Sequence, residues 1–108
     1  MKIFVEGSKR AAVTRMFPIW QKMGHIVVDN LEKADVRLSV ITVRTSQNLP
    51  TVLRLDGILY DKGMDYENVN TRISASYSAV DAVVYQSQLA KAMCEKYLSK
   101  RKTNVYDV

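Results

Sequence analysis

Short apolar runs alternate along this chain with stretches in which apolar residues recur every three or four positions. A strand buried in a parallel sheet is apolar on both faces, whereas a helix on the surface of a domain is apolar along one stripe. The pattern therefore predicts a mainly parallel sheet whose strands are joined by helices and loops. The six expected strands comprise residues 2–5, 25–29, 35–41, 51–55, 82–85 and 104–108.

The first helix is predicted to begin near residues 12–14 and to end at Gly24. With Thr14 as its N-cap, Pro18 falls in the first turn, where the missing N–H has no intrahelical partner to lose. The apolar residues recur at three and four positions, so we expect one buried stripe. It comprises Val13, Phe17, Trp20 and Met23, with Met16 and Ile19 beside them.

Two later helices are predicted over residues 66–80 and 88–98, and Ser87 is expected to cap the second one. The expected buried positions of the first are Tyr66, Val69, Ile73, Tyr77 and Val80. Those of the second form two adjacent rows, Leu89, Met93 and Tyr97 in one and Ala90, Cys94 and Leu98 in the other. Residues 42–50 and 56–65 are polar and are predicted to be loops.

The composition is that of one folded domain. Hydrophobic residues make up 47% and charged residues 25% of the 108 residues, as in an ordinary globular protein rather than a disordered chain. Together with the order of elements, this predicts an α/β fold, a Rossmann-like three-layer sandwich that forms a single domain over residues 1–108. The apolar runs are too short for a signal-peptide core or a membrane span, so we expect a cytoplasmic protein with no membrane span.

Cysteine and histidine are too scarce for several kinds of site. The chain has one cysteine, Cys94, and one histidine, His25. These numbers exclude an internal disulfide, a Cys/His metal cluster and a Ser/His/Asp catalytic set, and we expect no metal and no cofactor. Cys94 is interpreted as a small buried hydrophobe. His25 is interpreted as structural, because it opens a strand at the edge of the sheet opposite to the one where ligands bind.

The formal charge of +5 favours an anionic partner such as a nucleotide, a phosphate or a nucleic acid. Part of the excess lies in the last predicted helix and just after it, at Lys91, Lys96, Lys100, Arg101 and Lys102. These cations either form a solvated face that stabilises the carboxyl end of the helix or bind nucleic acid. No aromatic or recognition-helix pattern accompanies them, which favours the first interpretation.

Polar residues follow the fourth and fifth expected strands: Asp56 and Gly57 after one, Gln86 and Ser87 after the other. Ligands of an open parallel sheet bind beyond the carboxyl ends of its strands, so we predict a cleft there. Asp56 is the candidate catalytic residue, because a carboxylate in this position can orient or deprotonate a bound hydroxyl. Arg54 and Gly57 beside it are candidate substrate-binding residues. Alternatively, Asp56 only pairs with Arg54, one strand period away on the same face. Gln86 and Ser87 either bind hydroxyl groups or, in the case of Ser87, only cap the next helix.

Gly7, Ser8 and Lys9 follow the first expected strand and reach the same edge of the sheet. Glycine permits a close approach of backbone N–H groups to a ligand, so Gly7 and Ser8 are candidate binding residues. Alternatively they only turn the chain, because the full glycine pattern of a dinucleotide or phosphate loop is lacking. Lys9 either contacts a phosphate or is a solvated charge at the entrance of the first helix.

Several short motifs occur in a characteristic order. They are Glu6-Gly7-Ser8, Met23-Gly24-His25, residues 34–39, residues 49–57, Asn70 with Ile73, and residues 79–87. In this order and spacing, the chain resembles the N-terminal domain of a GT-B glycosyltransferase, specifically of the retaining enzymes of family 4. The similarity covers nearly all of the 108 residues.

The resemblance implies a two-lobed enzyme that transfers a hexose from a nucleotide sugar to an acceptor hydroxyl. Its N-terminal lobe would hold the acceptor, with Asp56 and the Gly7-Ser8 loop lining the cleft, and a C-terminal lobe would hold the nucleotide sugar. We expect this chain to be inactive alone and to need that C-terminal lobe, separately encoded or missing, as its partner. The alternative is a small non-catalytic binding or regulatory protein that reuses the lobe, either as a homodimer or on nucleic acid.

Overall fold

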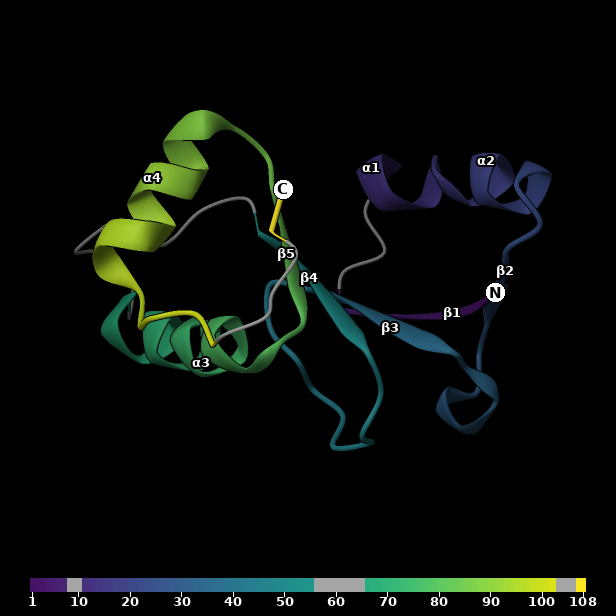
Figure 1. Cartoon of the computed structure of the whole chain (residues 1–108), viewed down its shortest axis with the longest axis horizontal. Coiled ribbons are helices and arrows are strands. Elements are labelled where there is room, and N and C mark those ends of the chain that lie inside the picture. Colours follow the sequence, from purple (N-terminus) through teal and green to yellow (C-terminus); the bar gives the residue numbers. More distant parts are fainter. Residues whose placement is uncertain (8–10, 56–65, 103–106) are drawn as a thin grey trace.

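The computed structural model describes residues 1–7, 11–55, 66–102 and 107–108. The described chain forms an elongated α/β domain of 41 × 28 × 23 Å (Figure 1). Its strands are β1 (Lys2–Glu6), β2 (Ile26–Val28), β3 (Val36–Val40), β4 (Thr51–Leu55) and β5 (Ala82–Tyr85). Its helices are α1 (Ala11–Thr14), α2 (Phe17–Lys22), a single 3-10 turn η1 (Leu31–Lys33), α3 (Tyr66–Ala79) and α4 (Gln88–Tyr97).

The five strands form one sheet in the order β2-β1-β3-β4-β5, and every adjacent pair is parallel. The chain passes from β1 to β2 on one side and then crosses to β3 on the other side of β1. This is a doubly wound order, and ligands of such sheets bind beyond the carboxyl ends of the strands where the order reverses, here at β1 and β3. The predicted Rossmann-like α/β fold is confirmed, with five described strands rather than six.

One face of the sheet, which we call the α3 face, is packed under α3 and α4. Leu53, Leu55 and Val83 on this face form a buried cluster with Ile73 and Tyr77. Val80 and Cys94 complete the cluster. Figure 1 shows α3 and α4 grouped at the β5 end of the sheet.

The opposite face, which we call the groove face, is covered only in part. Val13 of α1 is fully buried against Ile3, Val5 and Val40, and Trp20 of α2 packs beside them. Figure 1 shows α1 and α2 at the β1–β2 end of the sheet, away from α3 and α4. The groove face of β3, β4 and β5 therefore lacks a helix of its own among the described residues.

The prediction of one helix with one buried stripe is wrong for the segment before β2. Helix α1 ends at Thr14 and α2 begins at Phe17, with Met16 as its N-cap and Pro18 in its first turn. The interruption changes the direction of the side chains, so periodicity across it does not describe one surface. Val13 is buried and Phe17 and Trp20 are partly buried, whereas Met16, Ile19 and Met23 are exposed.

The two rows predicted for α4 have different outcomes. Ala90 and Cys94 are buried as expected, and Leu98 packs against the core cluster, but Leu89 and Tyr97 of the other row are exposed. A helix at the end of the sheet has only one neighbouring surface to pack on, so only one of two apolar rows is buried.

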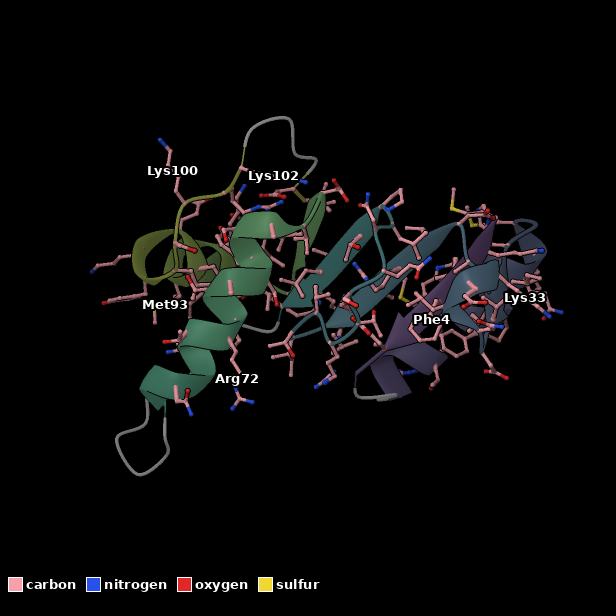
Figure 2. The ribbon with its side chains drawn as sticks, turned by 90° about the horizontal axis from the view of Figure 1, so that it is seen from below. Phe4, Lys33, Arg72, Met93, Lys100 and Lys102 are labelled. Atoms are coloured by element: carbon pink, nitrogen blue, oxygen red, sulfur yellow. The ribbon has the colours of Figure 1, made fainter. Side chains whose placement is uncertain are left out.

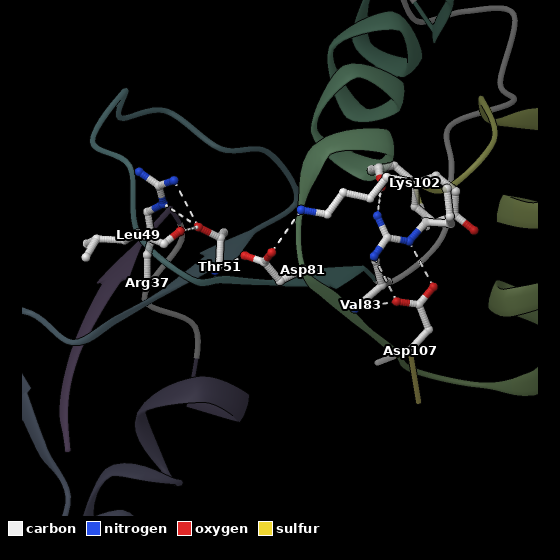
Figure 3. Close-up of polar contacts among 9 residues, drawn as sticks. Arg37, Leu49, Thr51, Asp81, Val83, Lys102 and Asp107 are labelled. Carbon is white, nitrogen blue, oxygen red and sulfur yellow. Dashed lines mark hydrogen bonds and ion pairs between the residues drawn. The ribbon is translucent and has the colours of Figure 1, made fainter. Parts of the chain in front are cut away.

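The predicted sixth strand falls mainly outside the described residues. Its last residue, Val108, donates its N–H to the Val83 carbonyl at 2.9 Å and accepts the Tyr85 N–H at 3.0 Å. Val108 therefore bonds to the residues on either side of Val84, which is the hydrogen-bond pattern of parallel strands. Asp107 strengthens the contact, because its Oδ1 accepts the Val83 N–H at 3.0 Å (Figure 3).

Candidate functional site

The carboxyl edge of the sheet is the candidate site, and the described part of it contains four of the predicted residues. Gly7 follows β1, Arg54 lies near the end of β4, and Gln86 and Ser87 follow β5. The other four predicted residues, Ser8, Lys9, Asp56 and Gly57, lie outside the described residues. Their predicted roles therefore stay predictions.

Gly7 lies at the point where the chain leaves β1, next to the end of β3. Its φ is 99°, in the left-handed region that glycine adopts without a steric penalty. A methyl group on Gly7 would lie 2.6 Å from Arg44 Nη1 and 2.8 Å from the Val40 carbonyl oxygen. Both the backbone conformation and the close approach therefore require glycine here.

The chain leaves β3 through a strained turn. Ile41 has a φ of 74°, which is rare for a β-branched residue, and the Thr42 N–H donates to the Val40 carbonyl at 2.9 Å. This is the arrangement of a classic γ-turn, an uncommon and strained conformation. The turn sends the loop back over the sheet, so that the Arg44 side chain reaches Gly7.

Arg44 is a site residue that the sequence analysis missed. It is exposed and places a guanidinium beside Gly7, at the edge where ligands of doubly wound sheets bind. A guanidinium with free N–H groups is suited to a carboxylate, a phosphate or sugar hydroxyls. Combining the strand order with the positions of charges after each strand would have found it.

Glu6 holds the loop that carries Arg44. The buried Glu6 carboxylate accepts Ser39 Oγ at 2.6 Å and the Arg44 N–H at 2.9 Å on Oε1, and Thr45 Oγ1 at 2.9 Å on Oε2. Burial acts to raise the pKa of Glu6, but these hydrogen bonds and the charge of Arg37 outweigh it and lower the pKa below 4.5. Glu6 therefore remains an anion that positions the loop and is not an available base.

Arg54 and Gln86 form a contact between the ends of β4 and β5. Arg54 Nη2 donates to Gln86 Oε1 at 2.8 Å, at a solvent-exposed position. This contact points the amide of Gln86 along the edge of the sheet, where its N–H₂ group is a donor for a ligand. The sequence predicted both residues as ligand contacts but did not predict that they contact each other.

Ser87 caps a helix, the structural role predicted as the alternative to ligand binding. Its backbone is extended, and its Oγ accepts the Ala90 N–H at 3.0 Å, so it is the N-cap of α4. The expected cap is confirmed, and binding of a hydroxyl by the same side chain stays a prediction.

Two of the five cations at the end of α4 are engaged in ion pairs. Arg101 pairs with Asp107 at 2.9 Å and Lys102 pairs with Asp81 at 2.8 Å, and Asp81 also accepts the Thr51 N–H (Figure 3). The hydrogen bond from Lys102, followed by that from Thr51, lowers the pKa of Asp81.

The Lys102–Asp81 pair lies at the amino edge of β4 and β5, opposite to the candidate site, whereas the Arg101–Asp107 pair lies beside Val83 within β5. Lys100, by contrast, points away from the molecule (Figure 2). The structural interpretation of the basic cluster is therefore favoured over nucleic-acid binding for Arg101 and Lys102.

The expectations for Cys94 and His25 agree with their positions. Cys94 is completely buried, and burial, followed by the charge of Glu95, raises the pKa of its thiol to about 11. A thiol of this kind is protonated at neutral pH and is not a nucleophile. His25 precedes β2 at the amino edge, where its backbone N–H donates to the Trp20 carbonyl.

Comparisons of this chain with protein-family models, curated proteins and solved structures give no match. The resemblance to family 4 glycosyltransferases therefore rests on the sequence motifs and stays a prediction. Among the described helices, none is both long enough and apolar enough to cross a membrane.

Proposed function

We propose that this chain is the acceptor-binding lobe of a two-lobed cytoplasmic glycosyltransferase. The complete enzyme would transfer a hexose from a nucleotide sugar, held by a C-terminal lobe, to a hydroxyl of the acceptor. One observation carries the proposal: two pairs of candidate residues, Gly7 with Arg44 and Arg54 with Gln86, lie at the carboxyl edge of a parallel, doubly wound sheet. That edge is the ligand-binding edge of this fold class.

Each of these residues has a role that its chemistry supports. The guanidinium groups of Arg44 and Arg54 donate hydrogen bonds to sugar or phosphate oxygens, and the amide of Gln86 both donates and accepts. Gly7 lets the ligand approach the backbone. Glu6, a described carboxylate at this edge, already accepts three hydrogen bonds and is not available as a general base. We therefore assign that role to Asp56.

The proposal is tested by NMR titration of the ¹⁵N-labelled chain with a methyl hexoside, and separately with a nucleotide sugar. We expect the amide signals of Gly7, Arg44 and Gln86 to shift, because the ligand lies against this edge. Gln86→Ala should weaken the binding about tenfold, which corresponds to about 1.4 kcal/mol. The matched control is Lys33→Ala, an exposed change in η1. Shifts confined to Asp35 and Asp81 at the amino edge would contradict the proposal.

A second measurement addresses the need for another lobe. The chain alone is expected to neither hydrolyse nor transfer a nucleotide sugar, because the proposed donor site belongs to the C-terminal lobe. Fusion to the donor lobe of a family 4 enzyme should yield transfer that Arg54→Ala reduces. Turnover at an enzyme-like rate by the chain alone would overturn the two-lobe scheme.

A further inference from the structure

A pocket of about 350 Å³ lies on the α3 face, between helix α3 and the loop of residues 41–50 that joins β3 to β4. It is near the amino ends of β4 and β5 and thus apart from the candidate site at the carboxyl edge. Its volume is at the lower end of the range for ligand sites, so it suits a small molecule rather than a macromolecule. The polar residues that line it are Arg37, Asn48, Thr51, Ser76, Asp81 and Lys102.

The side-chain oxygens of Thr51 and Asp81 are already engaged in this pocket (Figure 3). Asp81 Oδ1 accepts Lys102 Nζ at 2.8 Å, and Asp81 Oδ2 accepts the Thr51 N–H at 2.8 Å. Thr51 Oγ1 accepts two hydrogen bonds from Arg37 and donates to the Leu49 carbonyl at 2.9 Å. These acceptors therefore serve the protein itself.

Arg37, by contrast, has a donor to spare. Its Nε and Nη2 donate to Thr51 Oγ1 at 3.1 and 2.9 Å, and its Nη1 donates to the Thr45 carbonyl and hydroxyl at 3.0 and 2.8 Å. A guanidinium has five N–H groups, so one N–H of Nη2 has no acceptor among the described residues. Arg37 is only 6% exposed, and an unmatched donor at a buried position favours the binding of an acceptor.

Ser76 and Asn48 supply two more donors of this kind. Ser76 Oγ accepts the Val43 N–H at 2.9 Å, but its own O–H has no acceptor in the part of the chain that the structure describes. Ser76 is 9% exposed. The Asn48 side chain is exposed on the loop, and its N–H₂ group also lacks an acceptor among the described residues. Three unused donors, from a strand, a helix and a loop, thus line one pocket.

These unused donors, rather than net charge, determine the class of ligand. The charge of Arg37 acts on the nearby Glu6, and Lys102 pairs with Asp81 at 2.8 Å, so both cations have an anion close by. A carboxylate only accepts hydrogen bonds and has about four lone-pair sites, enough for all three donors. Hydrogen bonds to an ionised acceptor are also stronger than those to a neutral one. A neutral amide would instead place its own N–H₂ group against the donors of the pocket.

The carboxyl end of α3 lies at this pocket and is unfavourable for an anion. Its carbonyl groups are, however, partly engaged. The Tyr77 carbonyl accepts a hydrogen bond from the Arg101 guanidinium, and the Ser76 carbonyl accepts the Val80 N–H at 3.1 Å. The ammonium group of Lys102 lines the same pocket and offsets the remaining negative end of the helix dipole.

The rest of the pocket wall is apolar and made of short side chains: Val43, Leu49, Ala75, Ala79 and Val80. Val80 is buried, whereas the two alanines are exposed. A ligand with a short apolar body would remove these alanine methyl groups from water. The pocket therefore suits an organic acid better than an inorganic anion.

We propose that this pocket binds a small free carboxylic acid as its carboxylate. The carboxylate accepts hydrogen bonds from Arg37, Ser76 and Asn48, and a short apolar body lies against the alanine side chains of α3. The inference goes beyond the proposed function, because it concerns another part of the sheet and does not require sugar transfer. The occupant also contacts the loop that presents Arg44 to the candidate site.

The test is an NMR titration of the ¹⁵N-labelled chain with sodium propionate at constant ionic strength. We expect the amide signals of Val43, Asn48 and Ser76 to shift and to saturate. Propionamide has the same shape but no charge, and it should bind at least about tenfold more weakly. Sulfate, an anion without an apolar body, should also bind more weakly than propionate.

Two variants and one control locate the site. Asn48→Asp removes a donor and adds a negative charge to the pocket, so it should lower the affinity for propionate about tenfold. Gln47→Glu is the matched control, because Gln47 is the exposed neighbour on the same loop and does not line the pocket. It should change the affinity less than about twofold. Ser76→Ala should also weaken binding, and its amide spectrum checks that the variant is folded.

Four outcomes would overturn the inference. The first is equal affinity for propionate and propionamide, and the second is an equal loss in Asn48→Asp and Gln47→Glu. The third is sulfate binding as tight as that of propionate, which would assign the pocket to anions in general. The fourth is a set of shifts confined to Gly7 and Gln86, which would place the carboxylate at the candidate site instead. None of these results depends on whether the chain binds a sugar.

Discussion

The two faces of the sheet use similar apolar residues in different ways. On the α3 face, Leu53, Leu55 and Val83 are completely buried under α3 and α4. On the groove face, Val52 and Val84 belong to the same two strands and Leu38 to the neighbouring β3, and all three are only partly buried. β4 and β5 thus carry apolar residues on both sides, although the described helices cover only one side of them. Apolar sequence alone therefore does not distinguish a closed core from an open surface.

The difference has a local cause in how the chain connects its strands. The 14-residue helix α3 lies between β4 and β5, and α4 follows β5 and joins the same cluster. Of the described helices, the groove face receives the 4-residue α1 and the 6-residue α2, which together cover β1. A helix of six residues spans about 9 Å, so it cannot also extend over β4 and β5.

The largest expected effect comes from truncating one leucine on each face. Leu53→Ala should lower the free energy of unfolding by about 2–5 kcal/mol, because it leaves a cavity in a closed core. Leu38→Ala should cost less than about 2 kcal/mol, because the side chain is already partly solvated. Urea denaturation of both variants measures the difference, and equal losses would show that the groove face is as closed as the α3 face.

The next effect concerns the polar part of the α3 face, where Glu6 accepts three hydrogen bonds. Glu6→Gln should cost about 1.5–3 kcal/mol at pH 7. Glutamine lacks the negative charge, and its N–H₂ group cannot accept a hydrogen bond where a carboxylate oxygen did. The pKa of Glu6 in the folded protein lies below its value in the unfolded chain, so its contribution is present above pH 4.5 and is lost as the pH falls through the folded pKa.

The stabilities of wild type and Glu6→Gln should therefore converge on acidification. Denaturation curves between neutral pH and the acid limit of the fold measure this convergence. Ser78→Ala, an exposed hydroxyl change in α3, is a control that should show no such pH dependence. A constant difference between wild type and Glu6→Gln at all pH values would contradict the assigned ionisation of Glu6.

The smallest effects are expected from the two ion pairs near the carboxyl end of the chain. Asp107→Asn should cost about 1–2 kcal/mol, because its partner Arg101 is only 11% exposed and also loses a charged acceptor. Lys102→Met should cost less than about 1 kcal/mol, since its pair with Asp81 is 41% and 48% exposed. Thermal unfolding at low and high salt measures both variants, and a larger loss for Lys102→Met would reverse the interpretation of the two contacts.

The sheet was predictable from the sequence for a clear reason. Strands of a parallel sheet are apolar on both faces and end at polar residues or glycine, so their positions follow from short runs alone. The observed β4, Thr51–Leu55, and β5, Ala82–Tyr85, have the predicted bounds, and the other three differ from theirs by one residue at one or both ends. The cap by Ser87 was equally predictable, because it depends only on local sequence.

The candidate site was predictable only in part. Gly7 and Gln86 were identified because they follow strands, and Arg54 because it lies near the end of one; both criteria depend only on position in the sequence. Arg44 was missed because its position depends on the turn at Ile41, and Glu6 was missed because its burial depends on donors that lie more than 30 residues away. Contacts between distant segments leave no periodic signal in the sequence.

The clearest error in predicting the helices was the expectation that Met16 and Ile19 belong to the buried stripe. Periodicity across residues 11–23 counted them as core, but the chain breaks between Thr14 and Phe17. Pro18 was placed correctly in a first turn, although of α2 rather than of one continuous helix. The same break leaves both side chains exposed beside the open part of the groove face.

The hydrogen bond from Ser39 to Glu6 also has a consequence for how the sheet assembles. Glu6 and Ser39 are opposite each other on β1 and β3, as are Arg37 and Thr51 on β3 and β4, and both pairs are joined by side-chain hydrogen bonds. A slip of β3 by one residue would turn Ser39 and Arg37 to the groove face and leave a buried carboxylate without donors. Misaligned sheets are thereby penalised during folding, a selection against wrong pairings that two uniformly apolar strands would not provide.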